Sequence, residues 1–234
     1  MKQLLMITTI FLTTVMTGFS QVDLGFSTGL NVSNIHIAGA SNDFLPKRNF
    51  IATFRPALTV NIALDERFSI YTGVATEARG FDVSVGTDLG FLGVDLPIGV
   101  TAETRISYLE VPLNIRYNIT NASGKVKPWV AAGANLGYAY SGEIRTVANV
   151  LFDINLMKTP INLQNDNIRR FDVAPNITAG MDIPYKRGNF TLSVGYEHSV
   201  QNFLENTLVG VEARHYGFTP SIGYSHTLGL PQKT

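Results

Sequence analysis

Residues 105–119, RISYLEVPLNIRYNI, show the clearest alternation of apolar and polar side chains in the chain. A period of two over this length predicts a β-strand whose two faces lie in different environments. A membrane-spanning strand needs about 9–11 residues, whereas a typical soluble strand has about 5–6. Because a lipid-facing Arg costs roughly 2–4 kcal/mol at the bilayer midplane, we expect Glu110 and Arg116 to point inward. The aliphatic row from Leu109 to Ile115 then faces lipid.

Seven further segments repeat this alternation. They are residues 22–33, 54–64, 68–79, 128–140, 171–183, 190–200 and 216–228. The connections alternate between short turns, such as Asp65-Glu66-Arg67, and long segments, such as 80–104 and 141–170. Short periplasmic turns and long extracellular loops are typical of outer-membrane barrels. The sequence therefore predicts an all-β fold over residues 21–234: an eight-stranded antiparallel up-and-down transmembrane β-barrel with short periplasmic turns and long extracellular loops.

A soluble barrel of the lipocalin type would have the same number of strands with the two faces exchanged. The polar faces here consist mostly of Gly, Ala, Ser, Thr and Asn, with few charges. A water-facing exterior usually carries long charged side chains and avoids Gly, whereas the narrow interior of an eight-stranded barrel requires small residues. This composition favours the membrane barrel.

Four prolines fall one in each even-numbered predicted strand: Pro56, Pro112, Pro175 and Pro220. Each removes a ladder hydrogen bond, which predicts bulges or bends at a common height in the wall. Pro112 has inward parity and the other three have outward parity, so we also expect at least one register shift.

The first twenty residues have the features of an export signal. Lys2 is followed by an apolar stretch from Leu4 to Val15 and by the small-x-small sequence Gly18-Phe19-Ser20. About a dozen apolar residues are too few for a spanning helix, which requires roughly 20. We therefore predict that residues 1–20 are removed on export.

The composition narrows the function further. Charged residues make up 15% of the chain, below the roughly 25% of soluble domains, and 18 Lys and Arg balance 18 Asp and Glu. This balance gives no reason to expect a nucleic acid as partner. The chain has no Cys, which excludes disulfides, a catalytic thiol and a Cys-ligated metal.

Two motifs resemble those of the PorT-like family of outer-membrane β-barrel proteins. The segment YLEVPLNIRYNI matches the family's "YLEIPL" strand at Tyr108, Leu109, Glu110, Pro112 and Leu113. The segment KPWVAAGANLGY matches its next strand at Pro128, Ala132, Gly133 and Leu136, with Trp129 in place of the usual Tyr. The resemblance covers essentially the whole mature chain and implies an eight-stranded outer-membrane barrel. The family's namesake takes part in type IX secretion.

The charged residues of inward parity are the first candidates for chemistry. They are Arg55, Glu77, Arg79, Glu110, Arg116, Asp172 and Glu197. They could form a selectivity lining or a proton-sensitive gate, or a network of buried ion pairs that fills the barrel. Because the interior of an eight-stranded barrel is narrow, we expect the ion-pair network and no open pore.

The sequence predicts no catalytic, metal or cofactor site. The run Glu197-His198-Ser199 places neighbouring side chains on opposite faces of one strand, so His198 is badly placed to activate Ser199. The four histidines, at 36, 198, 215 and 226, lack the spacing of metal ligands.

The long loops offer a candidate interaction surface. Apolar residues alternate on both arms of the second loop and again in the third, which predicts a hairpin that continues beyond the membrane. The candidate residues are Val83, Val85, Leu96, Ile98, Phe152 and Ile154. A protruding sheet with an apolar face and an open edge can bind a partner by strand addition or through a hydrophobic patch. Alternatively, these loops pack on one another and cap the barrel.

The sequence thus predicts a non-enzymatic integral protein of the bacterial outer membrane, closed to bulk solute flow. Its expected partners are outer-membrane lipid and an extracellular or envelope protein that binds the loops. Two alternatives remain: an accessory component of type IX secretion and a barrel enzyme that acts on envelope lipid.

Overall fold

The computed structural model describes residues 21–38, 48–91, 94–119, 125–149, 153–164, 168–203 and 212–228. Within these ranges the side chains of 84–91, 94–100, 148–149 and 153–155 are not described. The predicted export signal, residues 1–20, lies outside the described residues. No helix in the described part of the chain is long and apolar enough to cross a membrane.

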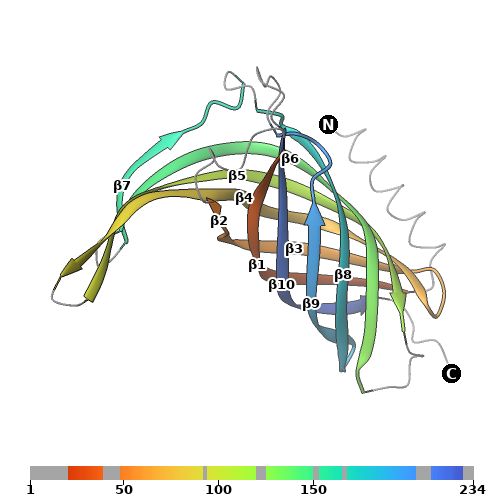
Figure 1. The fold of residues 1–234 in the computed structure, drawn as a ribbon. Helices are drawn as coiled ribbons and strands as arrows, with labels where there is room; N and C mark the ends of the chain where they lie inside the picture. The colour runs from red at the N-terminus through yellow and green to blue at the C-terminus, as the bar shows by residue number, and fades with distance from the viewer. Residues whose placement is uncertain are drawn as a thin grey trace, which may run out of the picture.

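Eight long strands form a closed wall (Figure 1). They are β1 (Val22–Ala38), β3 (Ile51–Ala63), β4 (Phe68–Phe91), β5 (Val94–Asn118), β6 (Lys127–Asn149), β8 (Phe171–Tyr185), β9 (Gly188–His198) and β10 (Glu212–Leu228). Each pairs antiparallel with the next, and β1 pairs with β10 to close the ring. Two short strands, β2 (Arg48–Asn49) and β7 (Asp153–Pro160), pair with β4 and β6. The predicted eight-stranded up-and-down barrel is confirmed.

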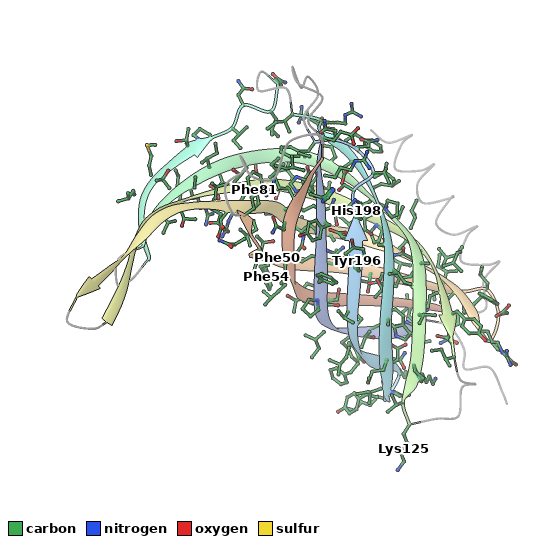
Figure 2. The ribbon with its side chains drawn as sticks, viewed as in Figure 1. Phe50, Phe54, Phe81, Lys125, Tyr196 and His198 are labelled. Atoms are coloured by element: carbon green, nitrogen blue, oxygen red, sulfur yellow. The ribbon has the colours of Figure 1, made fainter. Side chains whose placement is uncertain are left out.

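The two faces of β5 lie as the alternation predicts. Leu109, Val111, Leu113 and Ile115 are 46%, 38%, 48% and 51% exposed on the outside. The residues between them are buried inside the ring, with Tyr108 and Glu110 at 1% and 0% exposure. Phe54 and Tyr196, labelled in Figure 2, are likewise 64% and 37% exposed. An apolar exterior around a polar interior is the arrangement of a barrel in lipid, not of a soluble one.

The four prolines coincide with defects in the hydrogen-bonded ladders. The β3–β4 ladder ends at Ala57, beside Pro56, and the β8–β9 ladder begins at Asn176, beside Pro175. The β4–β5 and β1–β10 ladders each omit two residue pairs, at Pro112 and at Pro220. The prolines therefore interrupt ladder pairing, but no register shift lies at any of them within the described strands, and Pro112 keeps its inward direction and its register with Asn135.

The recorded register shift within the wall lies elsewhere, between Ser107 and Tyr108 in the β5–β6 pair. There Ser107 pairs with Ser141 and Tyr108 pairs with Ala139, so β6 contains one extra residue, Tyr140. The bulge reverses the inward parity of β6, because a one-residue insertion moves every later side chain to the other face.

The short turns lie at one end of the barrel, which Lys125 marks in Figure 2. In the β3–β4 turn the backbone N–H groups of Phe68 and Arg67 donate to the Asp65 carboxylate at 2.6 and 2.7 Å. These two hydrogen bonds hold the pKa of Asp65 below its usual value. By the general rule for outer-membrane barrels, this end faces the periplasm.

At the opposite end, β4, β5 and β6 continue beyond the barrel as a projecting sheet, to which β7 is added beside β6 (Figure 1). We define it as residues 80–91 of β4, 94–105 of β5 and 142–149 of β6, together with β7. The β4–β5 pairing extends without interruption from Gly80 and Arg105 to Phe91 and Val94. Twelve residues of strand correspond to about 40 Å, at roughly 3.4 Å per residue. The predicted continuation of this hairpin is confirmed for the backbone.

Candidate functional site

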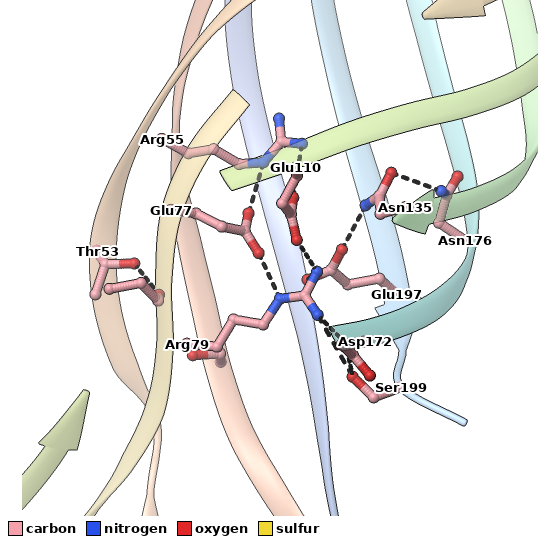
Figure 3. Close-up of polar contacts among 12 residues, drawn as sticks. Thr53, Arg55, Glu77, Arg79, Glu110, Asn135, Asp172, Asn176, Glu197 and Ser199 are labelled. Carbon is pink, nitrogen blue, oxygen red and sulfur yellow. Dashed lines mark hydrogen bonds and ion pairs between the residues drawn. The ribbon is translucent and has the colours of Figure 1, made fainter. Parts of the chain in front are cut away.

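Charged side chains from five strands meet inside the barrel (Figure 3). Six of the seven predicted inward charges belong to this cluster: Arg55, Glu77, Arg79, Glu110, Asp172 and Glu197. All but Arg55 are buried, and the Arg55 side chain is 15% exposed. The cluster crosses the lumen, because β3 and β4 lie opposite β8 and β9 in the ring.

Arg79 is the centre of the cluster. Its Nε donates to Glu77 Oε1 at 2.5 Å, and its NH1 group donates to Asp172 Oδ2 at 2.6 Å. Its NH2 group donates to Glu110 and lies 3.0 Å from Glu197 Oε1. One guanidinium therefore contacts four carboxylates, using the rigid fork of donors that only Arg provides.

Arg55 contributes the second positive charge. Its Nε donates to Glu77 Oε2 at 2.6 Å, and its NH2 group lies 3.4 Å from Glu110 Oε2. Carboxylate oxygens of Glu77, Glu110 and Glu197 lie within 4.8 Å of one another, a spacing that could hold a metal ion. Arg79 already contacts all three carboxylates as their cation, so the residues present do not fit a metal site.

Arg116, the seventh predicted residue, forms a separate cluster nearer the short turns. It donates to Asp182 and lies over the Trp129 ring, with Cζ 4.4 Å from the ring centroid. The indole Nε1 of Trp129 and the hydroxyl of Thr191 also donate to Asp182, at 3.1 and 2.8 Å. The Trp that replaces the usual Tyr of the resembling motif is thus part of an interior network.

Several members of these networks were not among the predicted site residues. Asn135 donates to Glu197 Oε2 at 2.6 Å, and Ser199 donates to Asp172 Oδ2 at 2.7 Å. Asp182 shares the inward parity of Asp172 in the same strand, so its inward position could have been found from the alternation. The pairing of Asp182 with Arg116 could not have been found in this way, because the two residues lie 66 residues apart in sequence.

A polar cavity of about 100 Å³ lies in the part of the barrel that both clusters border. Its lining includes Asn61, Asn114 and Asn176, whose buried side-chain oxygens have no hydrogen-bond partner within the described protein. Water takes about 30 Å³ in the liquid, so a polar cavity of this size has room for a few molecules. The cavity therefore has both the room and the polar partners that buried water requires.

Next to the Arg79 cluster, on the side of the long loops, lies a buried apolar cluster that we call the apolar lid; its Tyr108 ring centroid is 5.3 Å from Arg79 Cζ. It consists of Ile106, Tyr108, Ala139, Leu163 and Ile168, with Ile161 and Phe203 packed against them. The His215 ring lies 4.9 Å from that of Phe203. The connections thus cap the barrel in part, through Ile161, Leu163, Ile168 and Phe203.

The run Glu197-His198-Ser199 does not bring a base to a nucleophile. Ser199 is buried inside, bonded to Asp172 and Arg79. The His198 ring stacks on Tyr216 at 6.2 Å and lies 3.5 Å from the Tyr196 hydroxyl. The two side chains occupy opposite faces, as the alternation predicts.

The predicted loop surface falls on the projecting sheet. Val83 is half-buried and pairs with Ala102, and the backbones of Val85, Leu96 and Ile98 lie in the β4–β5 hairpin. Ile154 lies in β7, whereas Phe152 lies outside the described residues. The side chains of Leu156 and Met157 in β7 are 58% and 60% exposed.

Replacement of Arg79 tests the energetic role of the cluster. Arg79→Met leaves four carboxylates in the interior without their shared cation, and we expect it to lower the free energy of unfolding by about 3–5 kcal/mol. The matched control is Arg145→Met, because Arg145 pairs with Glu143 on the projecting sheet and both side chains are partly exposed. We expect a loss of about 0–1 kcal/mol there. Urea-induced unfolding in detergent micelles measures both, and equal losses would contradict a central role for Arg79.

Solved structures of three bacterial barrels are similar in fold. Neisserial surface protein A is 9% identical, with 88% of this chain and 96% of that chain covered and a TM-score of 0.35. The N-terminal β-barrel domain of Pseudomonas aeruginosa OprF is 9% identical, with 90% and 98% covered and a TM-score of 0.37. The outer membrane protease OmpT of Escherichia coli is 10% identical, with 89% and 97% covered and a TM-score of 0.45.

None of the curated protein sequences compared with this chain matches it. The profile of one protein family, described as "Outer membrane protein beta-barrel domain", matches residues 17–205, which is most of the chain. The match agrees with the closed ring, the apolar exterior and the polar interior described above. The protein is an integral outer-membrane β-barrel, and the chain belongs to the outer membrane protein beta-barrel domain family.

Proposed function

We propose that this protein is a non-enzymatic barrel, closed to bulk solute flow, that presents its projecting sheet to a protein partner outside the membrane. The observation that carries the proposal is the outer edge of β7. Within the described residues, β7 pairs on one side only, with β6.

Two layers across the lumen support a closed barrel. The Arg79 cluster spans the interior from β3 and β4 to β8 and β9, and the apolar lid lies above it. Apolar side chains exclude water from the mouth, while the ion pairs leave the charges satisfied and the side chains fixed.

A strand with a free edge exposes backbone N–H and C=O groups that can pair with another chain. Leu156 and Met157 add exposed apolar side chains to this edge, and Leu156 is the extra residue where the β6–β7 register shifts. The neighbouring face of the sheet is charged, since Arg105 pairs with Glu103 and Arg145 with Glu143. This combination fits an extended polypeptide segment with apolar residues at alternate positions, which adds to β7 as a further strand.

The chain's own sequence limits uncontrolled pairing at this edge. Lys158 and Pro160 lie at the end of β7, and charged residues and prolines are common guards of edge strands. A partner strand must therefore accommodate Lys158, and its pairing with β7 must end before Pro160.

Planar-bilayer recordings test the closed barrel. We expect the purified protein to give no large, stable single-channel conductance, because the ion-pair cluster and the lid block the lumen. The Arg79→Met variant, recorded in the same bilayers, serves as the reference for a barrel with a disturbed lumen. A large and stable conductance of the unaltered protein would contradict the closed barrel.

Hydrogen exchange in native membranes tests the strand addition. We expect the amides of β7 to exchange more slowly in outer-membrane vesicles than in purified protein, because a bound strand pairs with them. The double variant Leu156→Glu, Met157→Glu should lose this protection, whereas Arg145→Ala, on the charged face of the same sheet, should keep it.

Deletion of residues 86–93 and 146–158 tests whether the projecting sheet is required for surface binding. The barrel should still assemble, while surface binding is lost. Unchanged surface binding, or equal exchange of β7 in membranes and in detergent, would refute the proposed interaction surface.

A role as an accessory of type IX secretion is the second candidate, and the resemblance to the PorT-like family favours it. In the structure the matching residues Tyr108, Glu110 and Pro112 are buried in the interior. Packing inside the barrel therefore explains why these residue types occur at the motif positions. Co-purification with subunits of the secretion machinery, lost when β7 is altered, would support this candidate and identify the partner.

A further inference from the structure

The outer wall carries an apolar groove near the short turns. The groove is shallow and open on its outer side, and it lies across β1, β9 and β10, which are neighbours in the ring. Its side walls are the outward side chains Leu24, Phe26, Phe190, Ile222 and Tyr224, all exposed on the lipid face.

A row of aromatic rings leads from this groove to the β8–β9 turn. The ring centroids of Tyr224 and Phe190 are 5.1 Å apart, and those of Phe190 and Tyr185 are 5.4 Å apart. A Cβ atom on Gly188 would lie 2.7 Å from the Tyr224 hydroxyl oxygen, so this hydroxyl reaches the turn. The row joins an apolar surface to the rim of the barrel, where aromatic residues of membrane proteins favour the interface.

Two basic residues form the turn at the end of this row. The Lys186 ammonium lies over the Tyr185 ring, with Nζ 5.2 Å from the centroid, and Arg187 follows it. The Thr227 N–H donates to the Arg187 carbonyl at 2.8 Å, which fixes the turn against the end of β10. Positive charge is therefore held beside the aromatic row and does not depend on a loose loop.

The backbone of Lys186 is unusual. Its φ of 52° lies in the left-handed region, at the first central residue of a two-residue hairpin turn. Glycine is the residue that such a position favours, because it avoids the strain of a side chain. A lysine here keeps a cation beside the groove at the expense of backbone strain.

We propose that this face binds one phospholipid of the periplasmic leaflet, with its phosphate at Lys186 and Arg187 and an acyl chain in the groove. The groove begins at Leu24, which is level with Gly188 through His226, and ends near Ile222, which is level with Leu192. The groove therefore extends from the level of Gly188 to roughly 14 Å along the strands, at about 3.4 Å per residue. The phosphate and the chain of one lipid molecule can thus contact the two parts together.

Native mass spectrometry of the delipidated protein in a non-ionic detergent tests this site. The probes are palmitoyl-oleoyl phosphatidylglycerol and the diacylglycerol with the same chains, which lacks the phosphate. We expect phosphatidylglycerol to bind at least about fivefold more tightly than the diacylglycerol, the gain expected for one basic residue near a lipid phosphate.

Lys186→Gly is the decisive variant. It should weaken phosphatidylglycerol binding about fivefold and leave diacylglycerol binding unchanged. The barrel should remain at least as resistant to heat in a gel-shift assay, because glycine relieves the strain at this φ. The matched control, Lys125→Gly, removes the same charge from another short turn and should leave binding unchanged.

The groove is tested separately by Phe190→Ala, which should weaken binding of both lipids, against Leu113→Ala on another part of the lipid face, which should not. Equal effects of Lys186→Gly and Lys125→Gly would overturn the proposal. So would equal binding of the two lipids, which would mean that the groove holds an acyl chain without recognising phosphate.

Discussion

The fold depends on one constraint: hydrocarbon offers no hydrogen-bond partners to the backbone. Each unpaired N–H or C=O group in lipid costs several kcal/mol, so a sheet that crosses a membrane must close on itself. The β1–β10 pairing provides this closure and joins the two ends of the barrel chain. Where Pro112 and Pro220 interrupt ladders, each gap is limited to two residue pairs, and pairing resumes in the same register on the far side.

Closure of only eight strands determines what the interior can contain. The lumen is narrow, and charged residues of inward parity must find partners across it. Arg79 meets this need for four carboxylates from β4, β5, β8 and β9, so a single side chain ties opposite walls together. Buried ion pairs add little net stability compared with an apolar core, but the loss of one partner is expensive. The cluster therefore fills the lumen and fixes the shape of the barrel, with a polar cavity on one side and an apolar lid on the other.

The features at the two ends of the barrel are extensions of the same strands. Beyond the membrane, β4, β5 and β6 no longer need to close a ring, so the sheet opens and β7 becomes an edge. At the other end, the short β8–β9 turn brings Lys186 beside the lipid-facing aromatic row. The two proposed contacts, a protein at the far edge and a phospholipid at the rim, thus use opposite ends of one barrel.

The alternation in the sequence predicts the direction of most wall side chains, including Glu110 and Arg116, because a period of two has a simple geometric meaning. It does not predict which inward groups meet. Arg79 and Asp172 are 93 residues apart, and their contact depends on the curvature of the closed ring. The bulge at Tyr140 leaves no signal in the alternation of apolar residues, and the lid residues Leu163 and Ile168 lie in a connection without periodicity. The positive φ of Lys186 could not be predicted, because a lysine and not a glycine occupies this position of the turn.

The central claim, that the apolar rows face lipid and the polar rows face a filled lumen, can be measured directly because the chain contains no cysteine. Single cysteines at residues 108–115 of β5, each labelled with a fluorophore in liposomes, can be quenched by brominated lipids or by a water-soluble quencher. Lipid quenching should be strong at 109, 111, 113 and 115 and weak at the residues between them. Strong quenching from water at the odd-numbered residues, with lipid quenching absent, would contradict the account.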